Sequence, residues 1–111
     1  MHYRVYYLFD RFGESVSSAS AVEMSARSIC DQLLPRLQSE DDFLGIIDPA
    51  ETILQILCER EPDRYWVELP MEAAKASYGT YMNLEELRAF VAQMPAVFDS
   101  KAIPGMVYRP W

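Results

Sequence analysis

Histidine is the side chain most often used for proton transfer near neutral pH, and the chain contains one, His2. His2 lies next to the start of the chain, where side chains are rarely held rigidly. The sequence therefore offers no well-positioned histidine to act as the general base of a catalytic triad. The serines within 15–20 lack the strand, sharp turn and helix that expose a catalytic serine, so helix N-capping is their expected role.

The two cysteines, Cys30 and Cys58, are the remaining candidate nucleophiles. They lie in segments that read as a helix and a strand, and neither belongs to a CxxC pair or stands beside a histidine. We therefore expect two free, buried thiols, which suits a reducing compartment. The glycines are scattered and form neither a P-loop nor a GxGxxG pattern, so the sequence does not indicate a nucleotide site.

Carboxylates offer two further arrangements. The acidic run at 40–42 together with Asp48 is nearest to a metal site, but it lacks the alternating ligands and central glycine of a calcium loop. A solvated acidic turn is the expected structure there. Glu68 lies close in sequence to Glu59 and Glu61, yet no histidine, lysine or metal ligand accompanies them to make an acid–base pair. The sequence therefore predicts no enzymatic activity, no metal and no cofactor.

The charge balance favours a protein partner. The 111 residues include 10 Lys and Arg against 17 Asp and Glu, a net charge of −7. This charge opposes binding to nucleic acid or to an anionic membrane and favours a partner with a basic surface. A surplus of acids also keeps a small protein soluble, so charge alone identifies no partner.

The start of the chain, MHYRVYYLFDRFGE, lacks the basic beginning and the long apolar run of a signal peptide. The sequence also has no run of about 18 apolar residues that would span a bilayer. We therefore expect a cytoplasmic protein.

The elements that would position these side chains begin with a strand over 3–9, which is rich in aromatic and β-branched residues and whose odd-numbered members would share one face. A helix over about 20–38 is predicted next, because Ser20 and Glu23 make a capping box. Pro35 is expected to kink or end that helix near the preceding residue. The apolar stripe of the helix has spacings of three and four and consists of Val22, Ala26, Ile29, Leu33 and Leu37.

Three β-rich runs follow, FLGIID, ETILQILCERE and RYWVELP, separated by the turn-forming pieces DPAE and EPDR. They predict an antiparallel meander. Asn83 and Glu86 make a second capping box, which predicts a helix from there to Pro95. The segment KASYGTY before it reads as a loop, whose aromatic side chains either anchor the loop to the core or bind a partner.

The elements occur in the order β-α-β-β-β-α, with no internal repeat, and fit a single domain over residues 1–111. The expected fold class is α+β: a mostly antiparallel four-stranded sheet with two helices. Residues 96–111 read as an extended C-terminal tail on the body, with a short strand at MVYR.

Strand parity gives the clearest indication of a binding surface. In 64–69, Tyr65, Val67 and Leu69 point to one face, whereas Trp66 and Glu68 point to the other. The same alternation in the preceding strand places Ile53, Gln55, Leu57 and Glu59 beside Trp66. That second face is too apolar for plain solvent exposure. Either a helix or the tail covers it, or it is an interface centred on Trp66 with an acidic rim.

The stretch ETILQILCEREPDRYWVELPM, followed by SYGTYMNLEELRAFVAQMP, resembles small bacterial immunity proteins that neutralise polymorphic or contact-dependent toxins. The resemblance covers residues 43–95 and consists of a strand carrying ILQ, an acidic turn, a strand reading YWVELP, then SYG and an LEEL helix. It implies a protein without enzymatic activity that docks an acidic surface on a toxin domain. The first 40 residues and the tail lie outside it, so the toxin class stays open.

Three other functions remain open: an acidic phage- or plasmid-encoded inhibitor that mimics nucleic acid, a secretion chaperone, and an enzyme of unknown type. The sequence also leaves open whether the chain forms a homodimer. Gene neighbourhood separates these functions, because an immunity gene is expected next to its toxin gene. On the immunity interpretation, the predicted partner-binding residues are Trp66, Glu68, Glu59, Glu61, Asp63, Asp41 and Asp42.

Overall fold

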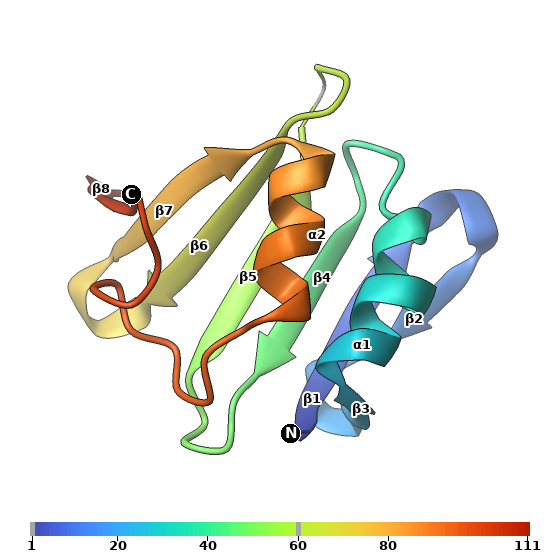
Figure 1. Ribbon diagram of the computed structural model, residues 1–111, viewed down its shortest axis with the longest axis horizontal. Coiled ribbons are helices and arrows are strands. Elements are labelled where there is room, and N and C mark those ends of the chain that lie inside the picture. Colours follow the sequence, from blue (N-terminus) through green and yellow to red (C-terminus); the bar gives the residue numbers. More distant parts are fainter. Residues whose placement is uncertain (1, 60) are drawn as a thin grey trace.

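A computed structural model describes residues 2–59 and 61–111. Within these residues, eight strands form one antiparallel sheet in the order β2-β1-β4-β5-β6-β7-β8, with β3 also paired to β1 (Figure 1). The strands are β1 (His2–Phe9), β2 (Glu14–Val16), β3 (Val22–Ser25), β4 (Phe43–Ile47), β5 (Ile53–Cys58), β6 (Tyr65–Met71), β7 (Ala76–Met82) and β8 (Val107–Pro110).

The α+β class and the antiparallel sheet are confirmed, but the expected four strands are too few for the described residues. The segment KASYGTY is not a loop, because Ala76–Met82 pairs along the whole length of β6 as β7. A short turn and Lys75, with φ of 48°, reverse the chain between these two strands. The short strand expected near the end of the tail is β8, which pairs with β7.

The first helix begins later than its apolar pattern predicts. Residues Val22–Ser25 form β3 on the edge of β1, where Arg4 pairs with Glu23, so the Ser20 capping box does not form. Sheet pairing here overrides a helical pattern of side chains. The actual cap is Ser25, whose Oγ accepts a hydrogen bond from the Ser28 N–H over 3.1 Å. Val22, predicted to face the core, is 43% exposed.

The helix that follows changes its winding along its length. α1 (Ala26–Ser28) continues as a π-helical stretch over Ile29–Leu33 and ends in a 3₁₀ turn at Leu34–Arg36. The end near Pro35 agrees with the prediction, since proline cannot donate a hydrogen bond to the preceding turn.

The second helix, α2 (Leu84–Ala92), follows the sequence pattern closely. The Asn83 side chain accepts a hydrogen bond from the Glu86 N–H, and the Glu86 side chain accepts one from the Asn83 N–H. This completes the predicted capping box and satisfies two otherwise unpaired backbone donors.

Both helices lie on the same face of the sheet (Figure 1). The core is formed between them and the inward side chains of the strands, including Val5, Leu44, Ile56 and Val67 from the sheet and Leu87 from α2. Among the described residues, no helix covers the opposite face of the sheet (Figure 1), which we call the helix-free face.

Candidate functional site

The helix-free face carries every second residue of the central strands. The predicted parity is confirmed: Val67 and Ile56 are fully buried in the core, whereas their neighbours Trp66 and Leu57 point away from it as a cross-strand pair. The side chains on this face include Arg4, Tyr6 and Leu8 of β1, Phe43 and Ile47 of β4, Ile53, Gln55 and Leu57 of β5, Trp66 and Glu68 of β6, Ser77 and Tyr81 of β7, and Val107 and Arg109 of β8.

Two glycines allow aromatic rings to lie flat on this face. A Cβ atom at Gly79 would overlap the Trp66 ring, and one at Gly45 would overlap the Tyr6 ring. A glycine inside a strand often marks such a close approach. Register places Gly45 opposite Gln55 and Glu68 opposite Gly79, so Glu68 and Gln55 lie between the two rings.

Glu68 is a half-buried carboxylate held by neutral donors. The Trp66 indole N–H donates to its Oε1 over 2.9 Å, and the Ser77 hydroxyl donates to the same oxygen over 3.2 Å. Ser77 in turn accepts a hydrogen bond from the Trp111 indole N–H over 3.3 Å. Burial, and secondarily the negative charge of Glu68, raise the pKa of Tyr6 above its ordinary value.

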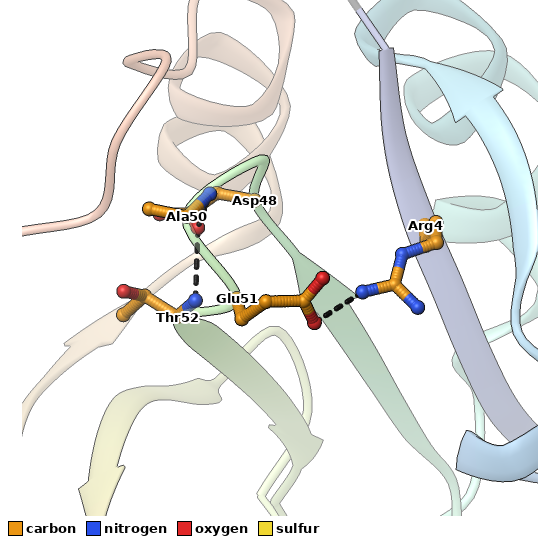
Figure 2. Close-up of polar contacts among 5 residues, drawn as sticks. All are labelled: Arg4, Asp48, Ala50, Glu51 and Thr52. Carbon is orange, nitrogen blue, oxygen red and sulfur yellow. Dashed lines mark hydrogen bonds and ion pairs between the residues drawn. The ribbon is translucent and has the colours of Figure 1, made fainter.

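Three arginines border the face, and each is already engaged. The Arg109 guanidinium lies 4.5 Å from the centre of the Trp66 ring, and that of Arg64 lies 3.9 Å from the centre of the Tyr81 ring. Arg64 also forms an ion pair with Glu61 over 3.1 Å. Arg4 forms an ion pair with Glu51, which projects from the turn between β4 and β5 (Figure 2).

The structure therefore combines the two interpretations of this face that the sequence left open. No helix in the described part of the chain covers it, but Arg109 of the C-terminal strand covers Trp66, which is only 9% exposed. Trp66 therefore lies beneath the outer surface of the face and is not its most exposed residue. The more exposed apolar side chains around it are Leu57, Tyr81 and Val107, the last of which pairs with Gly79.

Of the predicted acidic rim, Glu59, Glu61 and Asp63 lie in the turn between β5 and β6. Asp63, with φ of 58°, accepts a hydrogen bond from the Leu84 N–H over 2.6 Å and so caps α2 in addition to Asn83. Glu61 pairs with Arg64, at the edge of the helix-free face. These residues are surface groups at one end of the sheet, and part of their role is structural.

Asp41 and Asp42 differ in environment although they are adjacent. Asp41 is exposed, whereas the Asp42 side chain is 1% exposed and accepts hydrogen bonds from the backbone N–H groups of Asp10, Gln38 and Ser39 over 2.8–3.0 Å. Asp42 holds the segment before β4 in place and has no surface to offer a partner. Its expected place at an interface is therefore wrong in this structure.

Asp48 has a comparable role in the next turn. Its Oδ1 accepts from the N–H groups of Ala50 and Thr52 (Figure 2), and its Oδ2 accepts from the Phe98 N–H over 2.7 Å. Among the described residues, no group of three or more histidine, cysteine or acidic side chains is placed to hold a metal ion. Cys30 and Cys58 are free thiols, but only Cys30 is buried as expected; the partial burial of Cys58 raises its pKa.

A groove of about 580 Å³ lies on the helix side, between β7, α2 and the segment before β8. It is lined by Tyr81, Phe90 and Pro104 among others, and none of the predicted partner-binding residues contributes to it. Of the side chains assigned above to the helix-free face, only Tyr81 also lines the groove, so the two surfaces meet at the edge formed by β7.

Sequence reasoning missed Tyr6 and Arg109 as parts of the face. The alternation in YRVYYLF places Tyr6 opposite the core side chains, so its position was readable from parity. The position of Arg109 depends on the pairing of β8 with β7, which no local pattern reveals.

Neither helix in the described part of the chain has the length and apolar character needed to cross a membrane. Comparison of the chain with protein-family models, curated proteins and solved structures finds no match.

Proposed function

We propose that this chain is an inhibitory binding protein of the immunity type, which neutralises a toxin domain by docking its helix-free face on it. The observation that carries the proposal is the composition of that face: an apolar and aromatic centre at Leu57, Trp66 and Tyr81, with charged residues at its borders. A dry aromatic centre within a polar rim is the usual anatomy of a protein interface.

The fold supports this use of the sheet. The opposite face is filled by the two helices and the core, so the residues of the helix-free face are fixed on hydrogen-bonded central strands. Binding surfaces on a rigid scaffold lose little conformational entropy when they dock. The face is therefore preorganised for a partner of matching shape.

The net charge of −7 supports a basic partner, because complementary charge accelerates encounter. The surface acids Asp41, Glu59 and Glu61 lie in neighbouring segments at one end of the sheet, where Cys58 N–H donates to the Asp42 carbonyl. They place negative charge beside the helix-free face. The named function, immunity to a toxin, rests on the sequence resemblance over residues 43–95.

Co-expression tests the proposal. Each gene that neighbours the one encoding this chain is induced alone and together with it. We expect one neighbour to arrest growth, the chain to restore growth, and the two purified proteins to form a stoichiometric complex. A chain that rescues from no neighbour, and instead co-purifies with a nucleic-acid-processing complex, would replace this proposal with the acidic mimic.

A further inference from the structure

Glu68 is a carboxylate of the helix-free face that receives no cation from the described residues. Both hydrogen bonds described for its carboxylate go to Oε1, and both come from neutral groups, Trp66 and Ser77. No buried side-chain oxygen or nitrogen of the described residues lacks a hydrogen-bond partner, so Oε2, which receives neither bond, opens to solvent. Within the described part of the chain, no ion pair forms at Glu68.

The arginines of the face are bound to groups other than Glu68. Arg4 pairs with Glu51, Arg64 pairs with Glu61, and Arg109 stacks on the Trp66 ring. A half-buried carboxylate is usually compensated by a cation, because burial disfavours an isolated charge. The described cations of the face therefore leave room for a cation from a partner at the open Oε2 of Glu68.

We propose that Glu68 receives an arginine side chain of the partner protein, in a patch formed by Tyr6, Gln55, Trp66 and Glu68. This inference rests on the proposed binding function and names the chemistry that the face recognises. Charge complementarity selects the occupant: a carboxylate with an open oxygen, in an acidic protein, attracts a cation.

The composition of the patch suits a guanidinium group that contacts the Tyr6 ring, because Arg109 already stacks on the Trp66 ring. Gly45 and Gly79, beneath the Tyr6 and Trp66 rings, are three strand positions apart, or roughly 14 Å at about 4.8 Å per strand. Gln55 and Glu68 form the floor between them. A planar guanidinium stacks on aromatic rings and donates in a fork to oxygen, whereas an ammonium is a compact and strongly hydrated point charge. Arginine therefore fits the patch better than lysine.

A single-arginine peptide, acetyl-Gly-Arg-Gly-amide, tests the patch without the partner. The ¹⁵N-labelled chain is titrated with it, and the indole N–H resonance of Trp66 is followed, with Trp111→Phe used for assignment. We expect a saturable shift of the Trp66 indole resonance, and no such shift from the citrulline peptide, which keeps the shape and removes the charge.

Two matched variants complete the test. Glu68→Gln keeps the shape and the Oε1 acceptor, and we expect it to bind the arginine peptide about tenfold more weakly, as for a lost charged hydrogen bond. Glu85→Gln removes the same charge from an exposed position on α2 and should bind like the original chain.

Equal shifts from the arginine and citrulline peptides would overturn the inference, and this comparison needs no variant to fold. Equal affinity of Glu68→Gln and Glu85→Gln would overturn it as well. Either result would leave docking by the helix-free face standing if the co-expressed toxin still binds there. Failure of co-expression rescue, with the peptide still bound at Glu68, would instead remove the immunity function and keep the arginine site.

Discussion

The indole N–H of Trp66 donates a hydrogen bond of 2.9 Å to Glu68, two residues further along the same strand. The bond ties the largest aromatic ring of the helix-free face to its central carboxylate. Because residues i and i+2 of a strand share a face, the pair needs no other element to bring it together. The Arg109 guanidinium closes over the ring from β8.

Trp66→Ala should lower the free energy of unfolding by about 3 kcal/mol, as for a large side chain removed from a packed site. The ring contacts Gly79, Tyr81 and Arg109, all of which would lose a partner. Urea unfolding measures the change. Trp111→Ala is the control, because this residue is 61% exposed and its loss should cost less than about 1 kcal/mol. An unchanged midpoint for Trp66→Ala would mean that the ring is free to serve as an outer contact.

Gly79→Ala should destabilise the chain by about 1–3 kcal/mol, because the new methyl group occupies the space of the Trp66 ring. The ring must then lift from the sheet, so the indole resonance of Trp66 should shift as well. A loss of stability together with a shifted indole resonance would identify displacement of the Trp66 ring as the cause. A stability equal to that of the original chain, with an unshifted indole resonance, would show that the ring does not lie on Gly79.

Asp42→Asn should destabilise the chain by about 2–3 kcal/mol, since Oδ2 accepts from two backbone N–H groups and an amide nitrogen cannot accept. Thermal unfolding measures this loss. Asp41→Asn removes the same charge from the exposed neighbour and should stay within about 0.5 kcal/mol. Similar effects of the two variants would point to charge rather than to the buried hydrogen bonds.

Stability should fall as the pH rises through about 9 to 10 and beyond. Burial raises the pKa of Tyr3, Tyr6 and Tyr65 above 10.0 and that of Cys58 above 9.0, so the unfolded chain loses these protons first. The unfolded state then binds fewer protons than the folded state, and the free energy of unfolding decreases with pH. Well below pH 9 these groups are protonated in both states, and their stabilising effect is fully present.

Tyr6→Phe tests one of these groups, because the negative charge of Glu68 contributes to its raised pKa. Urea unfolding across the alkaline range should give a shallower decline for this variant than for the original chain. An identical decline would show that Tyr6 ionises equally easily in the folded and unfolded states.

The central strands and α2 were predictable because local pattern and tertiary environment agree there. Asn83 and Glu86 satisfy backbone donors within one turn. The residues around Val67 alternate between the core and the opposite face of the sheet, as their sequence predicts. The helix over 20–38 was only partly right, because the edge of β1 offers 22–25 backbone partners that a helical stripe cannot reveal. β7 escaped prediction because Gly79 interrupts its pattern, and that glycine exists to accommodate Trp66.

In the candidate site too, the features set by one strand were predictable, and those set by contacts between distant segments were not. Parity correctly placed Trp66 and Glu68 on one face, since it depends only on the strand. It could not show that Arg109 covers Trp66, or that Asp42 turns inward to three backbone N–H groups. Those contacts join segments distant in sequence, and an acidic run looks alike whether it is solvated or buried.

Docking by the helix-free face is tested most directly by the affinity of the rescuing toxin for two matched variants. Leu57→Lys places a charge in the apolar centre of the face, and Gln32→Lys places the same charge on the exposed surface beyond α1. The proposal predicts at least about a hundredfold weaker binding for Leu57→Lys, as for a disrupted interface centre, with Gln32→Lys unchanged and both variants folded. Full affinity of a folded Leu57→Lys variant would contradict docking by this face.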